Sequence, residues 1–253
     1  MTDSLKTRMA RGDLLVGTFV KTAAVEMIEV LAHSRLDFLC LDAEHSAFDR
    51  ARMDTCLAMA RALRVPTLVR VPSGTPERLL MALDAGATGV VVPHVDSVDK
   101  ARAIAKGARF GHGGRGFAGS TRWAGFATRG MAEILQQSVD ETIVIAQIEE
   151  PEGVEAAAAI AGVEGIDGLF VGPADLAVSL GLPSATDPKV LELIGEVGRA
   201  AKGAGKAFMT WTGGAANGRA LMDQGVRMFF VASEHAFMLK GANAEADALH
   251  ELG

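Results

Sequence analysis

Short, almost continuously apolar runs alternate along the chain with longer amphipathic segments. Runs rich in Val, Ile, Leu and Phe are typical of parallel strands that are buried on both faces. The pattern predicts eight strands, over 14–20, 36–42, 66–70, 88–92, 143–148, 166–171, 206–210 and 227–231. Helical spacing of apolar residues predicts helices over 23–32, 49–63, 76–84, 97–107, 127–138, 151–161, 189–204 and 214–224, with a last helix over 235–249.

Glycine punctuates this alternation, because several predicted helices stop at a glycine shortly before the next strand (Gly86, Gly162, Gly205 and Gly225). Eight strands that alternate with helices in 253 residues predict a (β/α)8 barrel of the α/β class. A doubly wound open sheet is the alternative. No linker or low-complexity tract divides the chain, so residues 1–253 are predicted to form a single domain.

Composition narrows the functional classes. The formal net charge of −6 does not attract nucleic acid or anionic lipid, so neither is an expected partner. Cys40 and Cys56 lie in apolar runs and are predicted to be reduced, buried residues. The first residues lack the apolar stretch of a signal peptide, and no run approaches 18 apolar residues, so a cytoplasmic protein is expected.

A barrel of this kind carries its chemistry where strands end and the following loops begin. Polar residues collect at these positions: Lys21, Asp42, Glu44, His45, Arg70, Gln147, Glu149, Glu150, Asp175, Thr212 and Ser233. This distribution is consistent with the barrel prediction and marks one end of it as the candidate site.

Two of these carboxylates, Glu149 and Asp175, follow adjacent predicted strands. Strand alternation places Gln147 and Glu149 on the same side. Two oxygen ligands from neighbouring strands suit a hard divalent cation such as Mg²⁺ or Mn²⁺. The structural alternatives stay open at this point: Asp175 as a helix N-cap, and Glu149 as a solvated acid before Pro151.

Three basic residues at the same end have both a chemical and a structural interpretation. Arg70 either holds a carboxylate or developing enolate, or forms a salt bridge across the barrel top. His45, with Asp42 and Glu44 nearby, is either a general base or a surface residue. Lys21 is the lysine placed for a Schiff base, although no feature of the sequence indicates the desolvated setting that such a lysine needs.

The segment Gly111–Gly116 formally matches the pattern G-x-G-x-x-G of dinucleotide-binding loops. A dinucleotide-binding loop of this pattern follows a strand, whereas this segment follows a predicted helix, so the dinucleotide interpretation is rejected. A loop with a structural role for Arg115 is expected instead. The remaining histidines, His94 among them, are assigned no chemical role.

Several stretches together resemble one known family. These are FLCLDAEHSAFD, PTLVRVP, LLMALDAGATGVVVPHV, VIAQIEEPEGV and VEGIDGLFVGPADLAVSLG, in the family's order and spacing. The chain resembles the HpcH/HpaI aldolases, the metal-dependent class II pyruvate aldolases typified by 4-hydroxy-2-oxoheptanedioate aldolase and 2-dehydro-3-deoxyglucarate aldolase. The resemblance spans nearly the whole chain, and the combination of motifs is more specific than any one of them.

The resemblance implies a role for each matching position. Glu149 and Asp175 correspond to the metal ligands, and the amides around Gly172, Ala174 and Asp175 to the site for the pyruvate carboxylate. Gln147 stands where the family also has glutamine.

The same resemblance implies the groups that act on the reacting atoms. Arg70 corresponds to the arginine that stabilises the enolate oxygen, His45 to the catalytic base, and Asp84 to its dyad partner. Asp84 ends a helix that runs away from the catalytic end, so it is expected to reach the His45 loop of a neighbouring subunit. The protein is therefore expected to be a homo-oligomer, and the resemblance implies a hexamer.

The sequence departs from the family pattern in three places. Ala43 precedes Glu44 and His45 where the family often has glycine, and RFGHGGRG replaces a proline-containing loop. Trp211 and Thr212 stand where small or aliphatic residues are common, and Ser233 and Glu234 follow the last strand. These positions are expected to shape the pocket for the aldehyde, and Trp211 and Thr212 are predicted to contact substrate.

The resulting prediction is a class II aldolase that cleaves or forms 4-hydroxy-2-oxo acids, with pyruvate or another 2-oxo acid and an aldehyde as small-molecule partners. Mg²⁺, Mn²⁺ or Co²⁺ is the expected cofactor, and no organic cofactor is needed. The alternatives are a citrate-lyase-like enzyme that acts on a CoA thioester, and a non-catalytic barrel that binds a small organic acid.

Overall fold

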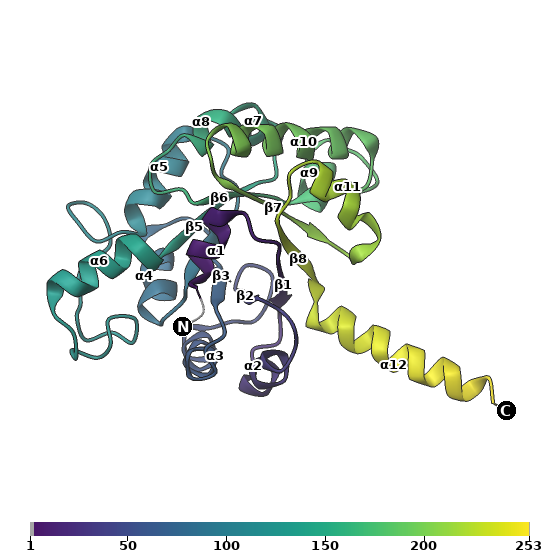
Figure 1. The fold of residues 1–253 in the computed structure, drawn as a ribbon, viewed down its shortest axis with the longest axis horizontal. Helices are drawn as coiled ribbons and strands as arrows, with labels where there is room; N and C mark the ends of the chain where they lie inside the picture. The colour runs from purple at the N-terminus through teal and green to yellow at the C-terminus, as the bar shows by residue number, and fades with distance from the viewer. Residues whose placement is uncertain (1–2, 253) are drawn as a thin grey trace.

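Eight parallel strands close into a barrel in the computed structural model, which describes residues 3–252 (Figure 1). Each strand pairs with the next along the chain, and the last pairs with the first. The strands are β1 (Leu15–Val20), β2 (Phe38–Asp42), β3 (Thr67–Arg70), β4 (Gly89–Val92), β5 (Ile143–Ile148), β6 (Gly168–Val171), β7 (Ala207–Thr212) and β8 (Met228–Ser233). The barrel prediction is confirmed, and the open sheet is wrong.

Helices surround the outside of the barrel, apart from α1, which precedes the first strand, and α12, which projects from the body (Figure 1). They are α1 (Leu5–Arg11), α2 (Val25–Ala32), α3 (Arg50–Ala62), α4 (Pro76–Asp84), α5 (Val98–Gly107), α6 (Met131–Glu141), α7 (Pro151–Glu155), α8 (Ala157–Ala161), α9 (Pro173–Ser179), α10 (Pro188–Gly203), the short 3₁₀ turn η1 (Ala215–Asn217), α11 (Gly218–Asp223) and α12 (Glu234–His250). Between residues 3 and 252, no helix has the length and apolar character needed to span a membrane.

The structure corrects some element boundaries. α1 was not predicted, because only Leu5 and Met9 of its seven residues are buried and the apolar signal is short. The predicted helix 151–161 is two helices, and 127–138 lies instead at Met131–Glu141. Gly86, Gly205 and Gly225 adopt the left-handed conformation expected after a helix, whereas before β6 it is Gly165 and not Gly162 that does so. Cys40 and Cys56 are free and buried, as predicted.

Alternate residues of the strands fill the barrel interior, so the barrel is a packed core and not a pore. Phe230 lies at its centre, with ring centroids 4.7 Å from Phe170, 4.9 Å from Phe38 and 5.2 Å from Phe19. The interior also contains Leu15, Cys40, Leu68, Val91, Ile143, Ile145, Met209 and Met228. Because side chains occupy the interior, the ends of the strands are the places left for substrate.

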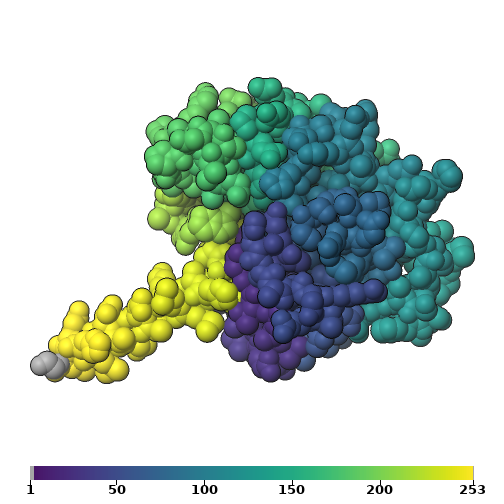
Figure 2. Space-filling model, turned by 180° about the vertical axis from the view of Figure 1, so that it is seen from behind, coloured from purple at the N-terminus to yellow at the C-terminus, as the bar shows by residue number. Residues whose placement is uncertain are grey.

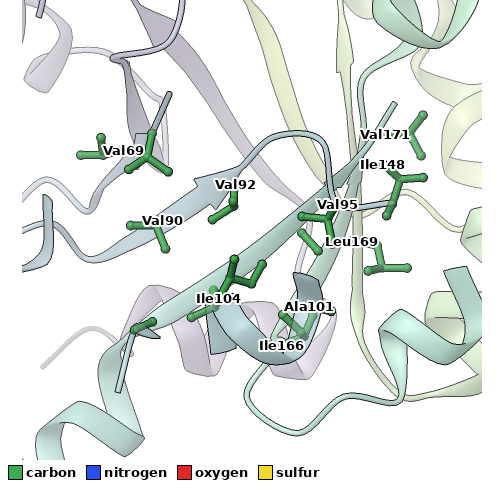
Figure 3. Packing of buried hydrophobic residues seen from close by; sticks show 14 of the residues in the cluster. Val69, Val90, Val92, Val95, Ala101, Ile104, Ile148, Ile166, Leu169 and Val171 are labelled. Carbon is green, nitrogen blue, oxygen red and sulfur yellow. The ribbon is translucent and has the colours of Figure 1, made fainter. Parts of the chain in front are cut away.

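The other face of the strands packs against the helices. Figure 3 shows Val90 and Val92 of β4 close to Ile104 of α5, and Ala101 and Leu169 belong to the same buried cluster. Burying a valine or isoleucine in such a layer stabilises the fold by about 1.5–3 kcal/mol. The two packed layers hold the strand ends at fixed relative positions.

Helix α12 does not pack along the barrel, although a helix was correctly predicted at 235–249. It projects away from the body of the molecule (Figures 1 and 2). Its only buried residue is Glu234, whereas Met238, Leu239 and Leu249 are 60–66% exposed. The Glu234 carboxylate anchors the helix by accepting hydrogen bonds from the Lys21 and Thr22 amides at 2.6–3.0 Å.

A substitution at Gly17 tests the tight packing of the interior. A Cβ at Gly17 would lie 2.4 Å from the ring of Phe38, which is fully buried. We expect Gly17→Ala to lower the free energy of unfolding by about 1–3 kcal/mol, because the ring must move out of a packed layer. Adding Phe38→Leu should recover part of the loss, as measured by urea unfolding at one protein concentration. Equal losses for Gly17→Ala in both backgrounds would show that the collision is not the cause.

Candidate active site

The barrel mouth is built by residues that extend the inward-facing columns beyond the packed interior. We define the barrel mouth as Lys21, Asp42, Arg70, Gln147 and Trp211, each two positions beyond an interior residue of its own strand. Glu149 lies two positions further along the same column as Gln147, so the predicted pairing of these two residues on one side is confirmed. The alternation of side chains along each strand therefore brings charged and polar residues together at this end of the barrel.

A buried ion pair between Asp42 and Arg70 lies at the centre of the mouth. Arg70 donates from Nε to Asp42 Oδ1 at 2.9 Å and from Nη2 to Oδ2 at 2.8 Å. Lys21 Nζ lies 2.8 Å from the same Oδ2, and the ring of Phe19 lies under the guanidinium at 4.5 Å. Arg70 therefore forms a salt bridge and also faces the mouth, while its contact with a carboxylate or enolate stays a prediction.

Burial alone would raise the pKa of Asp42, but its bonds to Arg70 and Lys21 outweigh burial and hold the pKa at about 2. Burial likewise opposes the charge of Arg70, yet Asp42 and Glu44 raise the pKa of Arg70 above its ordinary value. The pair is thus charged throughout the physiological pH range.

The loop after β2 carries Glu44 and His45 to the edge of the mouth. Glu44 is largely buried, and its Oε2 lies 3.3 Å from Arg70 Nε without a hydrogen-bond partner in the described part of the chain. Burial raises the pKa of Glu44. The His45 amide donates to Asp42 Oδ1 at 3.2 Å, while its ring is 56% exposed with Nε2 3.6 Å from Glu44 Oε2. His45 is therefore fixed at its backbone and open to a substrate or a second chain at its ring.

Glu149 is a buried carboxylate on the opposite side of the mouth. Its Oε1 accepts a hydrogen bond from the His94 amide at 2.8 Å, and Oε2 accepts one from Gln147 Nε2. Burial raises the pKa of Glu149 even so, and the nearby charge of Asp175 raises it further. A Cβ at position 172 would lie 3.0 Å from Glu149 Oε2, so glycine there leaves room beside the carboxylate.

Asp175 lies in the first turn of α9, directly after β6. Gly172 precedes this helix, but its amide donates to Ile148 O at 3.1 Å. Gly172 thus contributes space rather than a donor, and the predicted anion site rests on the amides of Ala174 and Asp175 at the start of the helix.

His94 belongs to the site, although the sequence analysis assigned it no chemical role. Its backbone is left-handed, with φ of 56°, and its Nδ1 lies 3.2 Å from Glu149 Oε1 and 3.1 Å from Glu150 Oε1. Its Nε2 lies 3.8 Å from Glu44 Oε1. The available signal was its position two residues after β4, the same strand-end rule that selected the other polar residues.

The donor set suits a divalent cation. Glu149 and Asp175 place two carboxylates close together, and Gln147 Oε1 is buried without a hydrogen-bond partner within residues 3–252. A hard cation would relieve the mutual repulsion of the carboxylates. The described residues contain no group of three His, Cys, Asp or Glu side chains arranged to hold a metal, so water and substrate oxygens would complete the coordination.

Trp211 and Thr212, predicted to contact substrate, lie on opposite sides of β7. Trp211 faces the mouth, is 36% exposed and donates from Nε1 to Ala232 O at 3.4 Å. Thr212 is buried, and its hydroxyl donates to Gly214 O at 2.8 Å. The structure thus brings Trp211, but not the hydroxyl of Thr212, to the inward face of the strands that forms the mouth.

Asp84 does not meet His45 in the same chain. It is the last residue of α4, and its Oδ1 faces Arg115 Nε at 3.8 Å. Asp84 borders a cleft of about 520 Å³ together with Arg50, Thr121 and Arg122. The expected dyad is therefore not formed within one subunit.

Comparisons with known proteins identify the family. The family model described as HpcH/HpaI aldolase/citrate lyase matches residues 15–241. A hydroxypyruvate/pyruvate aldolase of Paraburkholderia phytofirmans is 32% identical over 99% of this chain and 98% of its own length. A 4-hydroxy-2-oxovalerate aldolase of Rhodococcus jostii is 33% identical over 81% of this chain and 80% of its own length.

A solved structure agrees with the sequence relatives. A HpcH/HpaI aldolase/citrate lyase family protein from Burkholderia cenocepacia superposes with a TM-score of 0.91 at 35% identity, covering 99% of both chains. The chain belongs to the HpcH/HpaI aldolase/citrate lyase family and is a carbon–carbon lyase of the aldolase type.

Proposed function

We propose that this aldolase cleaves and forms 4-hydroxy-2-oxo acids, with pyruvate or a closely related 2-oxo acid and an aldehyde as the products of cleavage. The observation that carries the proposal is the buried Asp42–Arg70 pair beside the carboxylates of Glu149 and Asp175. The ion pair holds the guanidinium of Arg70 where an enolate oxygen develops. The two carboxylates of Glu149 and Asp175 suit a divalent metal ion. The names of the aldolase relatives support the same substrate class.

Glu149 and Asp175 would hold the cation, as Mg²⁺, Mn²⁺ or Co²⁺. When bound, the cation supplies Lewis-acid polarisation of the keto oxygen of the 2-oxo acid. The amides of Ala174 and Asp175 orient the carboxylate of the substrate. Gln147 holds Glu149 in place through its hydrogen bond to Oε2.

Arg70 stabilises the enolate and His45 moves the proton. Asp42 occupies Nε and Nη2 of Arg70, which leaves Nη1 without an acceptor in the described chain and available to the enolate oxygen. On cleavage, His45 accepts the proton of the C4 hydroxyl, the C3–C4 bond breaks, and its electron pair forms the enolate. The exposed ring of His45 is accessible for this transfer.

Lys21 has a structural role in this proposal. An imine mechanism needs a neutral lysine amine, whereas Lys21 Nζ lies 2.8 Å from the fully buried carboxylate of Asp42. The lysine therefore serves as a second counter-charge to Asp42.

The enzyme works as a homo-oligomer, for which the family resemblance implies a hexamer. Two features support this assembly: the Asp84 carboxylate borders an open cleft away from His45 of its own chain, and α12 exposes Met238, Leu239 and Leu249. Apolar side chains on a projecting helix are covered when the helix packs on another subunit.

Glu149→Gln tests the metal assignment. We expect loss of retro-aldol turnover at saturating Mn²⁺, together with weaker Mn²⁺ binding measured from the EPR signal of the free ion. Burial raises the pKa of Glu149, so the carboxylate of the metal-free wild type destabilises the fold increasingly as pH rises through that pKa. The metal-free variant should therefore be at least as stable as wild type at neutral pH.

Glu152→Gln, at an exposed acid of α7, is the control. Full activity of Glu149→Gln at saturating metal would refute the assignment.

Trp211→Ala tests the position of the aldehyde pocket. Removing the indole from the mouth should change the relative kcat/KM for bulky and small aldehydes by about 10-fold. Exchange of the pyruvate methyl protons needs no aldehyde, so it should change much less. Trp211→Phe should preserve the original preference. Equal losses in aldehyde turnover and proton exchange would place Trp211 in the machinery common to both.

Mixed oligomers test the pairing of His45 with Asp84 across subunits. Inactive His45→Ala and inactive Asp84→Ala proteins are dissociated, mixed and reassembled. Pairing between subunits should restore part of the activity, because some interfaces then contain both intact residues. Each variant reassembled alone is the control. If subunit exchange is demonstrated by mass spectrometry and no activity returns, the pair does not form between chains.

A further inference from the structure

Arg115 is a buried cation that the aldolase chemistry described above does not use. Its side chain is fully buried, and none of its three guanidinium nitrogens has a hydrogen-bond partner among residues 3–252. The guanidinium lies over the ring of Phe110 at 3.9 Å and near that of Trp123 at 4.9 Å. Within the described part of the chain, the one carboxylate in ion-pair range is that of Asp84, whose Oδ1 lies 3.8 Å from Arg115 Nε.

A contribution to the stability of the fold does not explain why an arginine is buried at position 115. Burial lowers the pKa of Arg115 to about 10, and the charge of Asp84 opposes the effect only in part. Replacing a buried charge by an apolar side chain of similar volume is often neutral or stabilising. A methionine between the two aromatic rings would satisfy the packing without the cost of burying a charge.

The surrounding loop is built so that Arg115 faces Asp84. Gly111 and Gly113 have positive φ, and a Cβ at position 114 would lie 2.4 Å from the carbonyl oxygen of Arg109. The resulting tight turn lets the Arg115 amide donate to that same oxygen at 2.7 Å. The glycine pattern that resembled a dinucleotide loop therefore has a different use here: it turns the chain back so that the guanidinium enters the core.

Asp84 lies between the buried guanidinium of Arg115 and the open cleft. Its side chain is 20% exposed, and its main-chain oxygen accepts a hydrogen bond from the Trp123 amide. The charged groups around it are Arg50 and Asp54 of α3, and Arg115 and Arg122 of the loop. Arg122 donates to Asp54 at 2.8 Å. Burial raises the pKa of Asp84, and Arg115 is the largest influence in the opposite direction, ahead of Arg50.

We propose that Arg115 is a positioning residue that keeps the Asp84 carboxylate charged and oriented at the cleft, ready to accept a hydrogen bond from the partner subunit's His45. The proposal rests on the pairing between subunits described under the proposed function. Arg115 touches no substrate and acts only through Asp84. The two aromatic rings, rather than hydrogen bonds, hold the guanidinium of Arg115 in position. Its charge therefore acts mainly on the carboxylate of Asp84.

The direct test is the titration of Asp84 in the intact oligomer. The ¹³C carboxyl resonance of Asp84 is identified by its absence in Asp84→Asn, and its midpoint is compared between wild type and Arg115→Met. Removing a cation at this distance should raise the midpoint by about one pH unit. The thermal midpoint of Arg115→Met should be unchanged or higher, which separates this role from a structural one. Arg115→Lys, which keeps the charge, should titrate close to wild type.

Kinetics supply the second readout. Arg115→Met should lower kcat/KM and move the acidic limb of its pH profile upward, and Arg115→Lys should restore part of both. In the Asp84→Asn background, Arg115→Met should have no further effect, because the group through which it acts is gone. Arg109→Met is the matched control: this arginine of the same loop pairs with Asp167, so its loss should cost stability without moving the pH profile.

The outcomes separate this proposal from the proposed function. Full activity of Asp84→Asn would overturn the dyad between subunits, and with it the use of Asp84 that is proposed here. An active-site role for Asp84 combined with an unchanged Asp84 midpoint in Arg115→Met would overturn the positioning role alone. Equal losses from Arg115→Met in the wild-type and Asp84→Asn backgrounds would do the same.

Discussion

The bidentate ion pair between Asp42 and Arg70 organises the whole site. Its two carboxylate oxygens also bind Lys21 and the His45 amide, so one buried group holds the side chains of Lys21 and Arg70 and the backbone of the loop after β2. Burying these charges is expensive, and the cost is offset because each oxygen is matched by a nearby cation and the interior below is rigidly packed. Without the Asp42 carboxylate, Arg70 would lose both of its side-chain hydrogen bonds and the His45 amide would lose its bond to Oδ1.

Charge balance across the mouth explains why the two sides suit different tasks. On the Arg70 side, cations match or exceed the carboxylate of Asp42, and its pKa is low. On the Glu149 side, burial and a second carboxylate raise the pKa of Glu149, and the His94 ring lies 3.2 Å from its Oε1. A metal and the anionic end of a 2-oxo acid suit the acid-rich side, while the enolate oxygen suits the arginine. This division supports the proposed orientation of the substrate.

The sequence was sufficient for the parts of the fold that depend on local pattern. The eight strands follow from short, almost continuously apolar runs, and the common side of Gln147 and Glu149 follows from period-two alternation along a strand. A salt bridge was one of two interpretations of Arg70, and Asp42 was not named as its partner, because the register that places these residues opposite each other is a tertiary property. His94 was missed because its contact with Glu149 depends on a left-handed backbone and on the pairing of β4 with β5. The direction of α12 was also not predictable, since apolar spacing shows that a helix has a buried face but not which chain buries it.

The anchoring of α12 links the outside of the molecule mechanically to the barrel mouth. Glu234 begins the helix, and its carboxylate holds the backbone of Lys21 and Thr22. The 17-residue helix is a lever about 25 Å long whose fulcrum lies beside the loop that supports Asp42. A force on the far end of this lever is therefore felt as a torque at the mouth. A protein that binds α12 therefore also restricts the loop from which Lys21 reaches Asp42. The position of the projecting helix is in this way coupled to the geometry of the barrel mouth.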